Sequence, residues 1–131
     1  MIKGTGIDIV DSRRIQKLLE VFNEKAKNRL FTKVEQEKAE SRKENILTYA
    51  KIFAAKEAFI KALGHSFGLS WTDMEITNNV FGKPAFCLSK KAKDVLKNLN
   101  LEDCFIHLSL SDEKPYAIAF VIIEGVAKNN Q

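Results

Sequence analysis

Phe53-Ala54-Ala55-Lys56-Glu57-Ala58-Phe59-Ile60-Lys61-Ala62-Leu63-Gly64 is the most strongly patterned stretch of this chain. It closes a predicted helix that begins near Asn45, and Gly64 is well suited to end it. A carboxylate on the inward face of such a helix needs a positive partner or a metal, because desolvating its charge is costly. We expect Glu57 on that face, since at about 100° per residue its neighbours are Ile46, Ala50, Phe53 and Ile60, whereas Thr48, Lys51, Ala55, Ala58 and Ala62 fall opposite.

A second acidic residue, Asp8, lies on the first predicted strand, Ile2 to Val10. Gly4, Gly6 and Asp8 share one strand face, and glycine in a strand marks the close approach of a ligand or of another backbone. On its own Asp8 is an ordinary strand-end aspartate. Together with Glu57 it offers two hard oxygen ligands from separate elements, which suits Mg²⁺.

Lys61 lies one turn after Glu57. It is either an ordinary partner of Glu57, a pair that contributes a few tenths of a kcal/mol on a surface, or a group that reaches a phosphate. Three other segments each have a plain structural interpretation. His107 is by default a hydrogen-bonded core histidine, His65 bonds the last carbonyls of the helix, and Gly82-Lys83-Pro84 forms a turn.

The composition fits one soluble domain, which we expect to cover residues 1–125, with a frayed tail at 126–131. The chain has 131 residues, of which 45% are hydrophobic and 29% charged. Its apolar runs are too short to span a bilayer and its N-terminus resembles a strand, so we expect a cytoplasmic protein without membrane contact. Cys87 and Cys104 lack metal-ligand spacing, and we expect buried thiols.

Positive charge is concentrated near the N-terminus. The formal net charge is +4, and the cations of this part face only Glu20 and Glu24. A basic end of this kind is a solvated face, a nucleic-acid footprint or a dock for an acidic protein. Nucleic acid is disfavoured, because no recognised nucleic-acid-binding motif accompanies the charges. The basic residues are Arg13, Arg14, Lys17, Lys25, Lys27 and Arg29.

The rest of the chain predicts a continuous α+β unit without repeats or linkers. Helices are expected from Asp11 or Ser12 to Phe22, from Lys25 to Leu30, from the capping box Thr32-Lys33-Val34-Glu35 to Ser41, and from Ser89 to Leu99. Two hairpins are expected: 71–77 with 80–88 around Asn78-Asn79, and 104–110 with 116–124 around 111–115.

Four segments together resemble one family: Gly6-Ile7-Asp8-Ile9-Val10, the helical stretch 53–64, Gly82-Lys83-Pro84 and His107-Leu108-Ser109. The family is the holo-acyl-carrier-protein synthase (AcpS) type of 4′-phosphopantetheinyl transferase, and the resemblance spans nearly the whole chain. It implies a compact α+β fold in which an antiparallel sheet packs on a long central helix. It also implies a homotrimer with coenzyme A in clefts between subunits.

The activity that the resemblance implies is transfer of 4′-phosphopantetheine from coenzyme A to a serine of an acidic apo acyl carrier protein. This releases adenosine 3′,5′-bisphosphate and serves fatty acid biosynthesis. Asp8 and Glu57 would hold Mg²⁺, with Glu57 or a water beside it as base. The other implied roles are coenzyme A phosphate contacts for Lys61 and His107, a coenzyme-binding position for Ser109, an adenine pocket bordered by Gly82, Lys83 and Pro84, and a carrier-protein dock at Arg14 with Arg13 and Lys17.

The chain departs from the family pattern at three places. Ile52 stands where relatives commonly carry arginine, so that a phosphate contact is either lost or supplied by Lys51. Gly64-His65-Ser66 replaces Gly-Thr-Gly, and Asp112 replaces a histidine of some members. Two other functions stay open: a non-catalytic basic module that binds an acidic protein, and a different Mg²⁺-dependent nucleotide hydrolase, which the lack of a P-loop disfavours.

Overall fold

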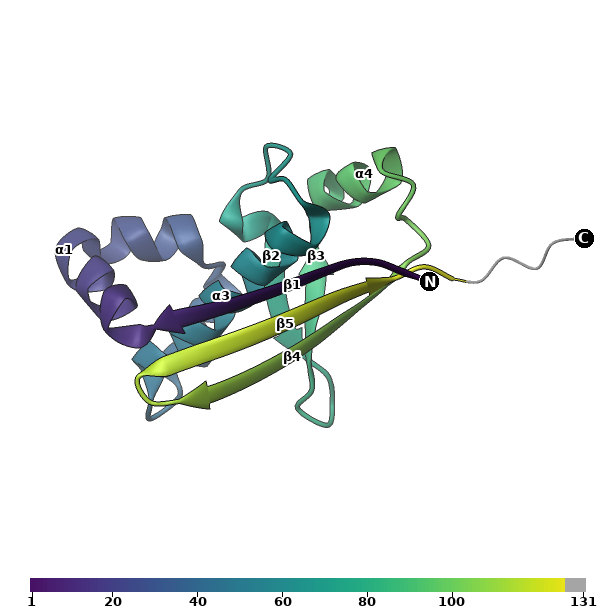
Figure 1. Cartoon of the computed structure of the whole chain (residues 1–131). Helices are drawn as coiled ribbons and strands as arrows, with labels where there is room; N and C mark the ends of the chain where they lie inside the picture. Colours follow the sequence, from purple (N-terminus) through teal and green to yellow (C-terminus); the bar gives the residue numbers. More distant parts are fainter. Residues whose placement is uncertain (127–131) are drawn as a thin grey trace, which may run out of the picture.

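The computed structural model describes residues 1–126, and the expected tail lies almost wholly outside this range. Figure 1 shows an α+β arrangement in which a sheet of long strands covers a central helix. This confirms the predicted fold class. The elements are β1 (Ile2–Asp11), α1 (Ser12–Leu30), α2 (Lys33–Glu40), α3 (Asn45–Leu63), η1 (Trp71–Asp73), β2 (Met74–Asn78), β3 (Pro84–Leu88), α4 (Lys90–Asn98), β4 (Phe105–Glu113) and β5 (Tyr116–Glu124).

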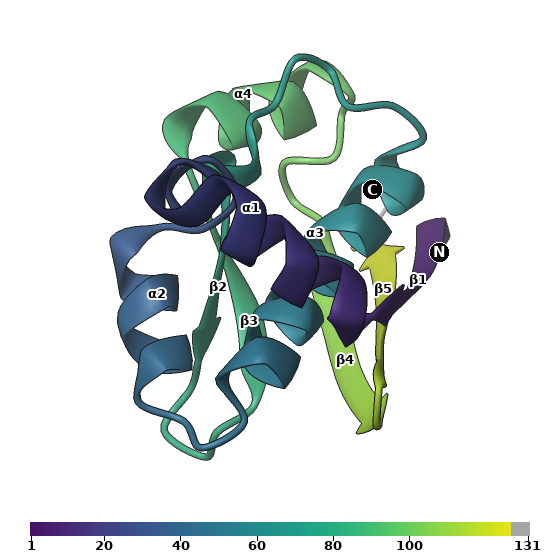
Figure 2. The same ribbon diagram turned by 90° about the vertical axis from the view of Figure 1, so that its left-hand side faces the viewer.

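The larger sheet is antiparallel with the strand order β1-β5-β4, and β2 pairs with β3 in a separate hairpin. Figure 2 shows α3 between this sheet and the hairpin. The inner side of β5 is closed, since Ala117, Ala119 and Val121 are fully buried. Because β5 lies in the middle, β1 and β4 form opposite edges about 10 Å apart, which is two strand spacings.

The contact between β1 and α3 depends on glycine. A Cβ added to Gly6 would lie 1.9 Å from the carbonyl oxygen of Ala58, and one added to Gly4 would lie 2.2 Å from that of Ala62. The two glycines therefore let the helix backbone approach the strand, one of the two reasons that the sequence offered for them. Ala55 and Ala58 are fully buried.

The prediction that Ala55 and Ala58 lie on the outward face of α3 is therefore wrong. The helix is covered on several sides, and β1 packs against its alanine side. A helical projection that looks for large apolar residues does not identify such a side as buried.

Most helix boundaries agree with their predicted caps. Thr32 and Glu35 form the reciprocal capping box, Ser89 accepts the Ala92 N–H, and Gly64 ends α3 with φ 87°. Asn23 leaves helical geometry with φ 49° and ψ −131°, so α1 has two parts. This agrees with the two helices predicted on either side of that residue.

The first hairpin is shorter than predicted. Trp71 to Asp73 form a single 3₁₀ turn in which Asp73 accepts the Ser70 N–H at 2.8 Å. The side chain of Asn79 accepts the N–H groups of Phe81 and Lys83 and holds the loop open. Both polar side chains bond nearby backbone groups in place of a strand ladder. In the second hairpin β4 continues to Glu113, so the predicted turn at 111–115 was too long.

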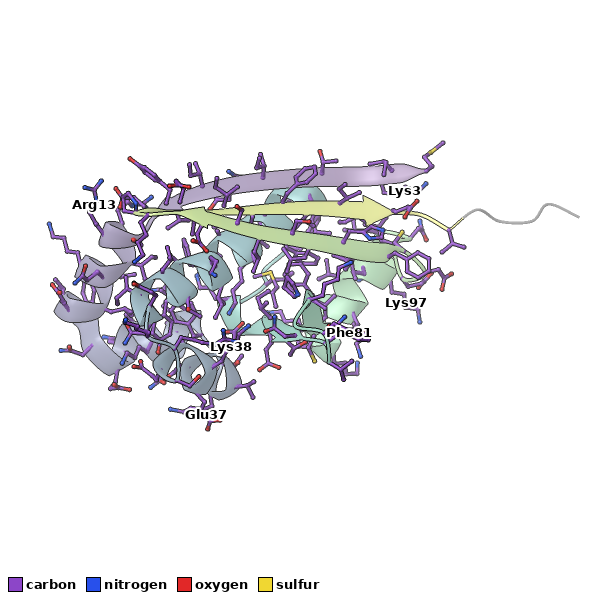
Figure 3. All side chains as sticks on the ribbon, turned by 90° about the horizontal axis from the view of Figure 1, so that it is seen from below. Lys3, Arg13, Glu37, Lys38, Phe81 and Lys97 are labelled. Carbon is purple, nitrogen blue, oxygen red and sulfur yellow. The ribbon has the colours of Figure 1, made fainter. Side chains whose placement is uncertain are left out.

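The outer face of the larger sheet is uncovered and carries several apolar side chains. Ile7, Ile9 and Phe105 are each 60% exposed, and Phe120 is 39% exposed. Figure 3 shows side chains on this face with no other element over them. An apolar sheet face of this kind marks an interaction surface. No helix among residues 1–126 is long and apolar enough to cross a membrane.

Candidate active site

Asp8, Glu57 and Lys61 lie close together where β1 crosses α3, and we call them the β1 cluster. The Lys61 ammonium donates to the Asp8 Oδ1 and to the Ile7 carbonyl oxygen, both at 3.0 Å. The Asp8 side chain is only 15% exposed, whereas that of Lys61 is 54% exposed. Lys61 thus pairs with Asp8 across the two elements, and no salt bridge to Glu57 is formed within residues 1–126.

Glu57 is half-buried, and its surroundings disfavour the charged form of its carboxyl group. Burial raises the pKa of its carboxyl above the ordinary value, and the nearby negative charge of Asp8 raises it further. Lys61 and Arg14 act in the opposite direction. Two carboxylates that disfavour each other's charge form a donor pair for a divalent cation. This hard-oxygen pair fits Mg²⁺, which takes one or two carboxylates and completes its shell with waters and phosphate oxygens.

The fully buried charges belong to a different pair, Lys56 and Glu35. The Lys56 ammonium donates to the Glu35 Oε1 and to the Leu30 carbonyl oxygen, both at 2.7 Å. Glu35 also accepts the backbone N–H groups of Thr32 and Ile76. The sequence alone did not predict this pair. Its pattern identified Glu35 only as a capping residue and placed Lys56 about 100° away from Glu57 around the helix. This ion pair joins α2, α3 and β2.

His107 and Ser109 are exposed on the outer face of β4, on the other side of the sheet from Asp8. The His107 ring nitrogen Nε2 is 2.8 Å from the Glu124 Oε1. The interpretation of His107 as a core histidine is therefore wrong, because alternation along β4 directs Leu108 inward and His107 outward. His65 likewise does not bond the helix end as expected; its Nδ1 accepts the Phe67 N–H. Cys87 is exposed, contrary to expectation.

The turn predicted at Gly82, Lys83 and Pro84 lies slightly earlier: Gly82, at φ 85°, closes a turn that begins at Asn79, and Pro84 already begins β3. Gly82 and Pro84 border a hollow of about 260 Å³ beside the inner face of β4. Its other lining residues are mainly basic or polar. Burial lowers the pKa of Lys38, and the charges of Arg42 and Lys51 lower it further. We call Lys38, Arg42 and Lys51 the basic pocket.

The basic pocket was missed because its members lie on different elements, α2, its following loop and α3. Only Lys51 had been singled out, as a substitute for an arginine at Ile52. Ile52 is 1% exposed and also lines the hollow, and Lys51 is paired with Asp112 at 3.1 Å. Two of the three departures from the family pattern, Ile52 and Asp112, therefore lie at or next to the same pocket.

The predicted docking residues begin α1. Arg13 is bound to Asp11 through several hydrogen bonds, and this interaction lowers the pKa of Asp11. Arg14 and Lys17 are exposed, and the charge of Arg14 reaches Glu57. The basic surface and the β1 cluster are therefore neighbours.

The predicted site residues form two groups on opposite edges of one sheet. Asp8, Glu57, Lys61 and Arg14 lie at the β1 edge. At the β4 edge, His107 and Ser109 lie on the outer face of the sheet, whereas the loop end at 82–84 and the basic pocket lie beside its inner face. Because β5 separates the edges, and because His107 and Ser109 point away from the side on which Asp8 lies, a single chain presents these residues on separate surfaces.

Comparison with known proteins shows one consistent likeness. The sequence model of the 4′-phosphopantetheinyl transferase superfamily matches residues 4–121. A holo-acyl-carrier-protein synthase from Bartonella tribocorum is 44% identical, with 98% of this chain and 99% of the relative covered. The crystal structure of the synthase from Neisseria meningitidis has a TM-score of 0.85 at 34% identity, with 95% of this chain and 99% of that chain covered.

A further solved structure holds a ligand. The synthase from Helicobacter pylori in complex with coenzyme A has a TM-score of 0.78 at 30% identity, with 92% of this chain and 99% of that chain covered. The residues matched by the family extend over both edges of the sheet, from Asp8 through Glu57 to His107.

Proposed function

Because the chain belongs to the 4′-phosphopantetheinyl transferase superfamily, we propose that the β1 cluster is its catalytic centre. The enzyme transfers 4′-phosphopantetheine from coenzyme A to a serine of apo acyl carrier protein and releases adenosine 3′,5′-bisphosphate. The observation that carries the assignment is the placement of Asp8 and Glu57 beside Lys61. We further infer that the reaction takes place in the cytoplasm and serves fatty acid biosynthesis.

Asp8 and Glu57 are the residues that would hold Mg²⁺. When bound there, the ion neutralises charge on the pyrophosphate of coenzyme A. The carrier serine Oγ bonds to the β-phosphorus while the bond from that phosphorus to the bridging oxygen breaks, and the leaving bisphosphate takes the bonding electrons. The serine proton passes to Glu57 or to a water beside it. Lys61 stabilises the negative charge of the phosphates.

We assign the basic pocket to the nucleotide end of coenzyme A. Lys38, Arg42 and Lys51 supply positive charge, and Gly82 at the end of the turn and Pro84 at the start of β3 supply a surface against which a flat ring can pack. His107 and Ser109 would bind phosphate oxygens. The hollow of about 260 Å³ is too small for the whole of coenzyme A, since pockets for drug-sized ligands measure about 300–1,000 Å³.

A homotrimer accounts for these two half-sites. Coenzyme A can contact both groups at once where the β1 edge of one subunit meets the β4 edge of the next. Contacts between two different surfaces generate a ring when the rotation between subunits closes, not a two-fold dimer, and a trimer is such a ring. The uncovered face around Ile7, Ile9 and Phe120 supplies the apolar area for such contacts.

Light scattering should give the mass of three chains, and the mass of one chain would contradict this assembly.

The acidic carrier protein would dock on α1. Arg14 and Lys17 are exposed on successive turns beside the β1 cluster, whereas Arg13 is partly neutralised by Asp11. A dock there delivers the serine to the metal site. Charges at the rim of an interface act mainly on the association rate and its salt dependence.

Reversal of the charge at Arg14 tests this dock. We expect Arg14→Glu to raise the KM for the carrier protein by roughly tenfold, because one attraction becomes a repulsion, with little change in coenzyme A binding. The salt dependence of kcat/KM should become weaker. Lys93→Glu on α4 makes the same change of charge elsewhere and serves as the control. Equal carrier KM values for both variants would remove α1 as the dock.

Mass spectrometry of an apo acyl carrier protein tests the function itself. The carrier is incubated with this protein, coenzyme A and Mg²⁺, and a parallel sample contains EDTA. We expect the mass of one phosphopantetheine to be added only in the sample with metal. If folded protein modifies none of several carriers, the non-catalytic module that binds an acidic protein becomes the better assignment.

A further inference from the structure

Lys61 is proposed to bind a phosphate, yet in this structure its ammonium is bonded to β1. Its ammonium donates to two oxygens of β1, the Asp8 carboxylate and the Ile7 carbonyl, each at 3.0 Å. Carboxylate and backbone carbonyl oxygens are also the ligands that hard cations choose. The Lys61 ammonium thus binds the same oxygens that a divalent cation would bind.

The two cations cannot share this place without cost. A divalent ion on Asp8 would lie within a few ångströms of the ammonium, and like charges at that distance repel even in bulk water. Asp8 is mostly buried and has little freedom to turn away, whereas Lys61 is 54% exposed and can move into solvent. When a divalent cation binds Asp8, Lys61 is therefore the side chain that moves away.

We propose that Lys61 is the internal counter-ion of Asp8 and that a divalent metal exchanges with it, which frees its ammonium to meet the phosphates of the substrate. This inference rests on the proposed metal site. Exchange keeps the charge of Asp8 compensated both before and after the metal binds. It also couples the two events, because the lysine becomes available for an anion only when the metal has taken its place.

The test is metal binding by the full chain without coenzyme A, with free Mn²⁺ counted by electron paramagnetic resonance. Lys61→Met keeps the length of the side chain but removes the competing charge. We expect it to bind Mn²⁺ about threefold more tightly or better, the scale of a partly exposed ion pair. Lys61→Arg retains a cation and should stay within about twofold of the parent protein.

Two controls separate the possible outcomes. Lys93→Met on α4 loses the same charge far from Asp8 and should bind Mn²⁺ like the parent, which excludes an effect of net charge alone. Asp8→Asn should abolish most of the binding in both backgrounds. If Asp8→Asn binds Mn²⁺ normally, the metal site itself is wrong. If Asp8→Asn abolishes binding but Lys61→Met binds no more tightly than the parent, the metal site stands and the exchange is refuted.

Discussion

Asp8→Asn and Glu57→Gln are expected to lower the rate of phosphopantetheine transfer by at least about a hundredfold, while the protein stays folded. Each change removes one of the two carboxylate charges that would hold the metal, and loss of a single electrostatic contact in a transition state commonly costs 10² to 10³ in rate, or about 3–4 kcal/mol. The amides keep the shape of the side chains, so the packing of β1 on α3 should survive.

The measurement is the rate of carrier modification, followed by mass spectrometry over a range of Mg²⁺ concentrations. Glu37→Gln, an exposed carboxylate on α2, is the matched control and should transfer at the parent rate. Thermal unfolding confirms that the variants are folded. If either variant at the β1 cluster keeps the parent rate, the corresponding carboxylate is not a metal ligand.

The sequence predicts the elements of the fold well because their signals are local. The caps at Thr32, Ser89 and Gly64 satisfy backbone groups within their own helices, and no distant contact overrides them. The predictions fail at Trp71 to Asp73 and at Val80 to Lys83, where side chains of Asp73 and Asn79 bond nearby backbone N–H groups.

The site is predictable only in part. Asp8, Glu57 and Lys61 stand out because charged residues interrupt an apolar pattern, and the fold brings them together. The pairing of Lys61 with Asp8 could not be predicted from the sequence, because the two residues are far apart in the chain and meet only in the folded structure. The basic pocket joins separate elements, and the separation of His107 from Asp8 follows from strand order. A single helical projection also cannot describe α3, which is covered on several sides.

The buried pair of Lys56 and Glu35 leads to the largest expected effect on stability. Both side chains are 0% exposed, and the Phe31 ring covers the ammonium at 5.5 Å from its centroid. Burial lowers the pKa of Lys56, whereas Glu35 raises it. Lys56→Met would leave the Glu35 carboxylate buried without its counter-charge, and such a loss typically costs about 3–5 kcal/mol of unfolding free energy.

Lys51→Met is a matched control in the same helix, because Lys51 also has an acidic partner, Asp112, but both side chains are about one-third exposed. We expect this control to lose less than about 1 kcal/mol. Urea unfolding of the two variants and the parent gives the comparison, provided that the slopes with denaturant agree.

A double variant separates the charge from the packing. Glu35→Gln combined with Lys56→Met removes both charges and keeps an amide oxygen for the Thr32 or Ile76 N–H, so it should be more stable than Lys56→Met alone. Equal stability of the two would mean that lost packing, not the unpaired carboxylate, causes the effect. Since Lys56 directly precedes Glu57 on α3, a pair that fixes the rotation of this helix also fixes the direction of the metal-binding carboxylate. Lys56→Met should therefore also weaken Mn²⁺ binding, and the double variant should recover stability without full recovery of Mn²⁺ affinity.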